Sequence, residues 1–153
     1  MALDVAPLST VERLEIREAC ERLALDYSFF ADGQRMDEWS QLFADDGELV
    51  LFGQTHRGPA AIRAAVGAGR GGEALSVHQI ANQRIDIVSA DEANATVYII
   101  VYAGARKDGG PASTSKIAPV MVGTYHDAYK RTPAGWKFAR RAFEPLITTA
   151  PPA

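Results

Sequence analysis

The chain has 153 residues, 47% hydrophobic and 23% charged, so it can enclose a core and has the composition of a soluble globular protein. Its net charge of −3, with no basic stripe carrying aromatic residues, argues against nucleic acid or an anionic membrane as a partner. No apolar run could cross a membrane, no secretory signal is present, and the single Cys20 excludes an internal disulfide. We therefore expect one cytoplasmic domain over 1–153, with its core at about 9–147.

The first predicted element is a helix that begins after Ser9. Ser9 can cap the helix, and Glu12 completes a capping box three residues later. We expect Asp32-Gly33 to end it, with Gly33 in the left-handed conformation. This places a carboxylate at the end of an apolar helix face. That face is indicated by side chains at helical spacing, namely Ile16, Cys20, Leu23, Tyr27 and Phe30.

A short second helix and a third helix are predicted before residue 67. We expect the segment 44–47 to break the second helix and the segment 48–53 to form a strand. Pro59 is typical of the first position of the third helix. The glycine-rich segment 67–73 lacks the lysine and hydroxyl residue of a phosphate-binding loop, so we interpret it as a lid or linker. The second helix is indicated by an apolar stripe of Met36, Trp39, Leu42 and Phe43.

Strands dominate the rest of the chain. Helices followed by neighbouring strands indicate an α+β fold, with helices packed on one face of an antiparallel sheet. We expect the sheet to curl around the first helix and to form a conical pocket whose wall includes the end of that helix. If Val97, Ile99 and Val101 line this interior, their alternating neighbours face outward. The predicted strands are 77–90, 95–107, 116–132 and 135–147.

The sequence contains three histidines that are candidates for functional groups. His78 opens a strand and is expected to share a face with Asn82, as either a core histidine or a base. His126 faces outward if its neighbour Tyr125 faces inward. His56 lies in a polar turn, where we expect no direct role.

Apart from the histidines, the sequence offers few groups that could bind a metal, act as a nucleophile or hold an anion. No histidine pair has metal-site spacing, and we predict no metal and no other cofactor. Cys20 lies on the buried helix face with no base beside it, so it is not expected to be a nucleophile. Arg140 and Arg141 are adjacent on a strand, so one of them faces the apolar side unless a bulge intervenes. That arginine could pair with an acid or hold an anion.

Four segments of the chain, namely 27–53, 56–64, 78–97 and 123–141, resemble the SnoaL-like branch of the nuclear-transport-factor-like superfamily. The resemblance covers about residues 9–147. It implies a curved, mixed sheet wrapped around the N-terminal helices, with a conical pocket. Members include dehydratases, isomerases, cyclases, dehydrochlorinases and non-catalytic subunits, so the fold is specified more closely than the reaction.

Within this family the site pattern is similar to that of lyases of the hexachlorocyclohexane dehydrochlorinase and bile-acid dehydratase types. Tyr27 matches a tyrosine of the dehydratase type. Tyr27 and Leu49 stand where the dehydrochlorinase type has lysine and tryptophan, and Val101 stands near where the dehydratase type has a further acid. The chain therefore matches neither type completely. The shared positions implied by the resemblance are Asp32, His78 and Arg141.

The resemblance implies general-base chemistry. Asp32 would orient His78 as the base, at an expected distance of about 2.6–3.2 Å. Tyr27 could donate to a leaving oxygen, and Arg141 could stabilise developing negative charge. Alignment with the family, counted from Trp136, places Arg141 in the pocket alongside Phe143. The alternative register, which a bulge could produce, would place Arg140 there. Expected substrate contacts are Leu49, Val101, Tyr125 and Phe143.

Three functions remain open at this point. The first is a cofactor-independent lyase, most simply a dehydratase, acting on a small, mostly apolar cyclic or aromatic compound. The second is an isomerase or cyclase that uses the same base, which the mass of the product would separate from a lyase. The third is a non-catalytic ligand-binding protein, similar to the small subunit of ring-hydroxylating dioxygenases, which leaves the Asp32–His78 pair without a mechanistic reason.

The outer face of the sheet predicts self-association. Tyr98, Ile100 and Tyr102 point away from the pocket if their neighbours line it. An apolar outer patch on a soluble protein indicates a partner, most simply another copy of the chain. We therefore expect a homotrimer or homodimer packed through the sheet.

Overall fold

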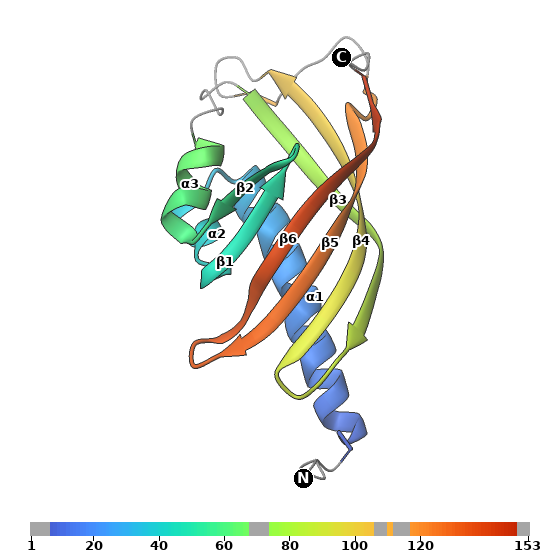
Figure 1. The fold of residues 1–153 in the computed structure, drawn as a ribbon. Helices are drawn as coiled ribbons and strands as arrows, with labels where there is room; N and C mark the ends of the chain where they lie inside the picture. Colours follow the sequence, from blue (N-terminus) through green and yellow to red (C-terminus); the bar gives the residue numbers. More distant parts are fainter. Residues whose placement is uncertain (1–6, 68–73, 106–109, 112–116, 150–153) are drawn as a thin grey trace.

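A computed structural model describes residues 7–67, 74–105, 110–111 and 117–149. Within these ranges two helices lead into a hairpin, and a third helix precedes four long strands (Figure 1). In chain order the elements are α1 (Thr10–Asp32), α2 (Met36–Ser40), β1 (Phe43–Leu51), β2 (Gln54–Arg57), α3 (Pro59–Gly67), β3 (Ala74–Ile87), β4 (Glu92–Ala105), β5 (Met121–Thr132) and β6 (Gly135–Thr148).

The strands of the described ranges form one sheet in the order β2-β1-β6-β5-β4-β3. β1 runs parallel to β6, and the other neighbouring pairs are antiparallel. The sheet curves around α1, while α2 and α3 lie at the side that carries β1 and β2 (Figure 1). The predicted α+β fold with a curved, mixed and largely antiparallel sheet is confirmed.

Helix α1 begins with the predicted capping box. The backbone N–H of Glu12 donates to Oγ of Ser9 at 3.3 Å, and the backbone N–H of Ser9 donates to the Glu12 carboxylate at 2.8 Å. The predicted face is turned to the sheet, and Phe30 is half-buried at its edge. No helix among the described residues has the length and hydrophobicity to span a membrane. The buried residues of this face include Ile16, Cys20, Leu23, Tyr27 and Ala31.

The end of α1 differs from the prediction. Gly33 has a φ of −76°, and the left-handed conformation is taken by Gln34, with a φ of 56°. A Cβ atom on Gly33 would lie 3.0 Å from the carbonyl oxygen of Phe29, so glycine is favoured there by a close backbone approach. The chain reverses one residue later than expected, and Asp32 is the last residue of the helix.

The second helix is shorter than its apolar stripe predicts. It ends at Ser40, and Phe43 already belongs to β1. The segment 44–47, expected to separate helix from strand, lies within β1, whose pairing with β6 shifts between Phe43 and Glu48. A Cβ atom on Gly47 would lie 2.8 Å from the carbonyl oxygen of Phe138, so glycine lets the bulged strand pass close to β6.

A two-residue turn, Phe52-Gly53, joins β1 to β2, and α3 begins at Pro59 as predicted. Ile62 anchors α3 in the core and is fully buried. Most of the glycine-rich segment interpreted as a lid or linker lies outside the described residues. So does most of the turn predicted after β4.

A bulge divides β3 into two halves. The pairing with β4 shifts between Ala81 and Arg84, and Asn82 has a φ of 47°. Asn82 is exposed, so the expectation that it shares the face of His78 is wrong. The extra residue reverses the alternation, because even-numbered residues such as His78 face the interior before the bulge and odd-numbered residues face it afterwards.

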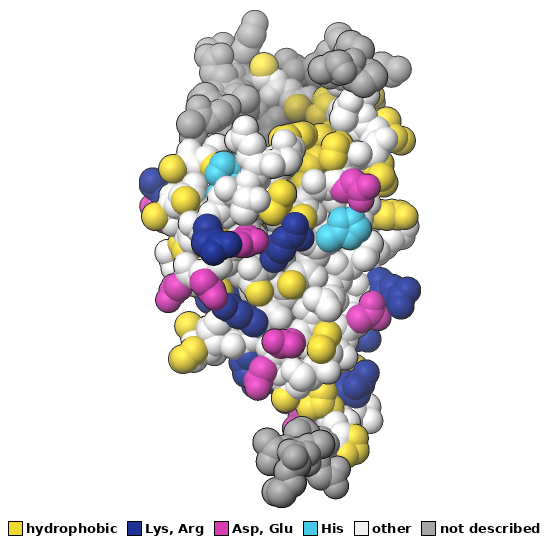
Figure 2. Space-filling model, viewed as in Figure 1, with side chains coloured by type: hydrophobic (Ala, Val, Ile, Leu, Met, Phe, Trp, Pro, Cys, Tyr) yellow, Lys and Arg dark blue, Asp and Glu magenta, His cyan; other side chains and the backbone are white. Residues whose placement is uncertain are grey.

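Strand β4 alternates as predicted. Val97, Ile99 and Val101 are buried against the core. On the other side of the strand, Tyr98 is 44% exposed and Ile100 is half-buried. The outer face of the sheet seen in Figure 2 carries charged side chains over its lower half and more apolar atoms towards its upper end.

Candidate active site

A pocket lies between the end of α1 and the inner face of the sheet. Its cavity has a volume of about 170 Å³ and is lined mostly by apolar and aromatic side chains. A larger depression of about 750 Å³ lies between α2 and α3, but charged surface residues such as Asp37 and Arg63 line it. The lining residues of the smaller pocket are Tyr27, Ala31, Trp39, Leu51, Phe52, Val66, His78, Val101, Met121, Tyr125 and Phe143.

Asp32 and His78 meet at the edge of this pocket. Nδ1 of His78 lies 2.5 Å from Oδ1 of Asp32, and the backbone N–H of His78 donates to Oδ2 at 2.8 Å. The side chains are 12% exposed for His78 and 22% for Asp32. One carboxylate therefore holds both the backbone and the ring of the same residue, which fixes the direction of the imidazole.

This contact determines which nitrogen of His78 can act as a base. When Nδ1 carries the proton shared with Asp32, Nε2 carries the free lone pair. His78 lines the cavity, whereas Asp32 lies behind it. The pair can therefore take a proton from a bound molecule, and the carboxylate would stabilise the imidazolium that forms.

Tyr27 enters the same pocket from α1. The residue is 4% exposed, and its ring centroid lies 5.0 Å from that of Trp39 and 5.6 Å from that of Tyr125. Burial, followed by the neighbouring Tyr125, raises the pKa of Tyr27 well above its ordinary value. Tyr27 is therefore a neutral phenol at physiological pH and can act as a hydrogen-bond donor or an acid.

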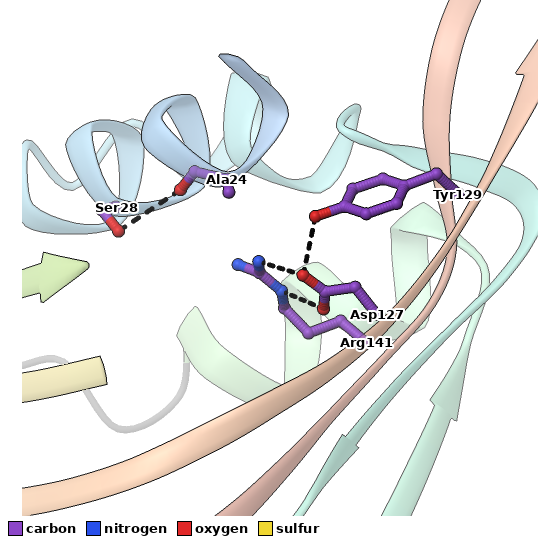
Figure 3. A network of polar contacts seen from close by, with 5 residues as sticks. All are labelled: Ala24, Ser28, Asp127, Tyr129 and Arg141. Atoms are coloured by element: carbon purple, nitrogen blue, oxygen red, sulfur yellow. Dashed lines mark hydrogen bonds and ion pairs between the residues drawn. The ribbon is translucent and has the colours of Figure 1, made fainter. Parts of the chain in front are cut away.

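Arg141 is fully buried beneath the pocket. Its Nε and Nη2 donate to the two carboxylate oxygens of Asp127 at 2.8 and 2.7 Å, and the Tyr129 hydroxyl donates to Oδ2 of the same carboxylate at 2.8 Å (Figure 3). Burial alone would lower the pKa of Arg141, but the charge and hydrogen bonds of Asp127 outweigh burial and raise it. Arg141 is therefore a permanent cation within a buried ion pair.

Aromatic rings separate this cation from the cavity. The centre of the guanidinium lies 4.2 Å from each of the ring centroids of Tyr27, Tyr125 and Phe138. Tyr27 and Tyr125 line the pocket, whereas Arg141 is not among the described lining residues. Its Nη1 has no hydrogen-bond acceptor within the described part of the chain, so the rings supply its remaining contacts.

The SnoaL-like domain family matches residues 12–142, a range that includes Asp32, His78, Tyr27 and Arg141. The chain belongs to the SnoaL-like domain family. No curated protein matches it.

Solved structures share the fold of this SnoaL-like protein. A candidate scytalone dehydratase from Novosphingobium aromaticivorans is 26% identical, with a TM-score of 0.76 over 92% of this chain and 91% of its own. An NTF2-like protein with a cystatin-like fold from the same organism is also 26% identical, with a TM-score of 0.74 over 92% and 88%. The type 3 hexachlorocyclohexane dehydrochlorinase of Novosphingobium barchaimii is 24% identical, with a TM-score of 0.71 over 94% and 100%. This last likeness shows the fold alone.

Three of the four expected substrate contacts line the pocket of this SnoaL-like protein, namely Val101, Tyr125 and Phe143. Leu49 is fully buried and does not belong to the described lining. Leu51, two residues further along the same face of β1, reaches the cavity instead.

A bulge in β6 settles which arginine faces inward. The pairing with β5 shifts between Ala128 and Tyr129, because β6 has one extra residue there. On a regular strand, residues three positions apart face opposite sides, but the bulge lets Phe138 and Arg141 both point to the interior. Arg140 is 47% exposed and lies 3.8 Å from the carboxylate of Glu48.

Sequence reasoning missed Asp127, although a signal for it existed. Tyr125, Asp127 and Tyr129 alternate along β5, so an inward Tyr125 predicts that the other two also face inward. Asp127 is directly opposite Arg141 in the pairing of β5 with β6. The pocket residues Trp39 and Phe52 were also not predicted as site residues.

The other candidate groups lie outside the site. His126 is exposed, as predicted, and its Nε2 lies 2.9 Å from the carboxylate of Glu144. Burial raises the pKa of Cys20 to about 12, so it is a thiol at neutral pH and a poor nucleophile. The described ranges contain no group of three or more histidine, cysteine, aspartate or glutamate side chains that could hold a metal ion.

Proposed function

We propose that this SnoaL-like protein is a cofactor-independent lyase acting on a small, mostly apolar cyclic compound. The observation that carries the proposal is the Asp32–His78 contact at the wall of an otherwise apolar and aromatic pocket. The cavity of about 170 Å³ is comparable with engineered cavities of ~150 Å³ that hold benzene. A single six-membered ring therefore suits the described part of the pocket.

His78 would begin the reaction by removing a proton from a ring carbon. Nε2 of His78 forms the new N–H bond, and the electrons of the broken C–H bond form a carbon–carbon double bond as the leaving group departs from the adjacent carbon. Asp32 balances the new positive charge through its 2.5 Å contact with Nδ1. The apolar lining excludes water and strengthens this electrostatic interaction.

Tyr27 would assist the departure of the leaving group. A hydroxyl leaves a carbon more readily when it receives a proton. The raised pKa of Tyr27 keeps its phenol protonated, and the Arg141 cation partly offsets the loss of acidity that burial causes. The net reaction is loss of water. Return of the proton from the His78 imidazolium to the Tyr27 phenolate, through solvent, restores both groups.

Arg141 would act through Tyr27 and not by direct contact with the substrate. Its guanidinium lies 4.2 Å from the Tyr27 ring centroid and is held by Asp127. A cation beneath the phenol favours negative charge on its oxygen, and the ion pair fixes the plane against which the ring packs. Arg141 is therefore a positioning residue in this proposal.

Product analysis tests the proposed reaction. The purified protein is incubated with single-ring alcohols that carry a ketone next to the reacting carbon, and products are measured by mass spectrometry. A lyase lowers the product mass by one water, whereas an isomerase leaves it unchanged. We expect Asp32→Asn and His78→Gln each to lower turnover by about 10²–10⁴-fold.

Matched controls separate this role from general damage. Asp86→Asn removes an exposed carboxylate from the same strand as His78, and His56→Gln removes a histidine that does not line the pocket. Both are expected to keep turnover. Full turnover in Asp32→Asn or His78→Gln would contradict the proposal, and a product of unchanged mass would assign an isomerase.

A further inference from the structure

Phe52 has an unfavourable backbone conformation. It occupies the first position of the two-residue turn between the paired residues Leu51 and Gln54. Its φ is 49°, and that of Gly53 is 79°, the positive pair that a type I′ hairpin turn requires. Asparagine is favoured at this first position, whereas a bulky residue with positive φ is an outlier. The turn therefore carries strain that another residue would relieve.

Burial of the Phe52 ring does not account for this strain. Phe52 is 67% exposed, and its ring contacts that of Phe143, at a centroid distance of 5.6 Å and an interplanar angle of 71°. The ring nevertheless lines the pocket that contains His78. An exposed aromatic side chain on a strained backbone, at the wall of a pocket, points to a contact with a ligand.

Phe52 also completes a row of aromatic rings along the pocket. Neighbouring centroids in this row are 5.0 Å apart for the first pair and 5.6 Å apart for each of the other three. All five residues line the cavity, and we call them the aromatic wall. In order, they are Trp39, Tyr27, Tyr125, Phe143 and Phe52.

We propose that Phe52 is a substrate-contacting residue that extends the aromatic wall, and that the ligands of this pocket are rings with a planar, unsaturated part. This inference rests on the proposed function for the identity of the pocket. Stacked and edge-to-face ring contacts favour a planar π system over a saturated ring of the same size. Phe52 contributes this preference at the exposed end of the row.

Phenol and cyclohexanol form a matched pair of probes, because each has one six-carbon ring and one hydroxyl group. Their dissociation constants are measured by protein NMR titration, without turnover. We expect the parent protein to bind phenol more tightly than cyclohexanol. Phe52→Asn is expected to weaken phenol binding by about three- to tenfold while changing cyclohexanol binding less, and Phe52→Tyr is expected to retain phenol binding.

The same substitution has the opposite effect on stability. Phe52→Asn places the favoured residue in the type I′ turn, so we expect Tm to rise by about 2–4 °C. A residue kept for packing alone would give a lower Tm. The combination of a more stable protein and weaker phenol binding therefore distinguishes a ligand contact from a structural one.

Three results would overturn the inference. They are an unchanged phenol affinity in Phe52→Asn, equal weakening of both probes, and a parent protein that does not prefer phenol. The binding test of this inference and the turnover test of the proposed function can also give different outcomes. Preserved phenol selectivity with full turnover in His78→Gln would reject the lyase and keep the ligand class. Loss of turnover in His78→Gln, together with a phenol affinity that Phe52→Asn leaves unchanged, would reject the role of Phe52 and keep the lyase.

Discussion

Replacing Asp127 by asparagine tests the buried ion pair beneath the pocket. The side chains of Asp127 and Arg141 are both 0% exposed, and the carboxylate accepts hydrogen bonds from Nε and Nη2 of Arg141 and from the Tyr129 hydroxyl. Asparagine offers one acceptor oxygen and directs an amide donor at these donors. Arg141 would be left as a buried charge without its counter-ion.

The expected loss is large for a single atom exchange. Removing one partner of a buried ion pair costs about 3–5 kcal/mol. For a chain of this size, each kcal/mol lowers Tm by about 2–4 °C, so Asp127→Asn should lower Tm by about 6–20 °C. Urea unfolding followed by circular dichroism is expected to show a lower midpoint with an unchanged slope.

Two further variants make this result interpretable. Asp86→Asn breaks the exposed Arg84–Asp86 pair and is expected to cost less than about 1 kcal/mol. The double variant Asp127→Leu with Arg141→Met removes both charges and should recover most of the stability. If Asp127→Asn costs no more than Asp86→Asn, the account of the buried pair is wrong. The double variant should still lose turnover, because Tyr27 no longer has its cation.

Three other outcomes are expected. Tyr27→Phe should lower kcat by about 10²–10⁴-fold in steady-state assays with little change in KM, because the ring remains and the acid is removed; an unchanged kcat would exclude Tyr27 as the acid. The free energy of unfolding should fall as pH rises from 9.0 towards about 12, because folded Cys20 keeps its proton while the unfolded thiol loses it. Cys20→Ala should make this fall shallower when the free energy is measured by urea unfolding at each pH, and the same dependence on pH in both proteins would refute this. Sedimentation at micromolar concentration should show a dimer or trimer that Ile100→Glu converts to monomer, and a monomeric parent protein would contradict this.

Local patterns predicted much of the fold. The Ser9–Glu12 capping box and the buried face of α1 are decided by residues within one helix, and the alternation of β4 is decided within one strand. These features depend on neighbours in the sequence, which is why the sequence contains them. The inward direction of Arg141 followed instead from alignment with the family, because simple alternation from Phe138 would place Arg140 inside and the bulge in β6 reverses it.

The bulges and the buried pair could not be predicted in the same way. A bulge adds one residue to a strand, and whether this is tolerated depends on the opposite strand, as the close approach of Gly47 to Phe138 shows. The helical stripe through Phe43 continued into β1 because its spacing does not mark where the helix stops. Asp127 is opposite Arg141 only once the pairing of β5 with β6 is known.

The bulge in β3 means that the site and the core depend on the residue count of one strand. The half of β3 that follows the bulge is held in place by the tight turn into β4. In this turn the backbone N–H groups of Val88 and Ser89 both donate to the carbonyl oxygen of Glu92 at 3.0 Å. His78 and Ile85 are an odd number of residues apart, so a β3 strand that kept every residue but lost the bulge would turn these two side chains to opposite faces. The half next to the turn would keep its phase, because turning it over would expose Ile85, which is 5% exposed.

The other half would then turn over instead, and His78 would point to the outer face of the sheet, away from Asp32. Deletion of Asn82 would not have this effect, because it would remove the extra residue and leave both side chains on the inner face. One strand can therefore supply both the core and the base of the proposed reaction only while it accommodates its extra residue as a bulge.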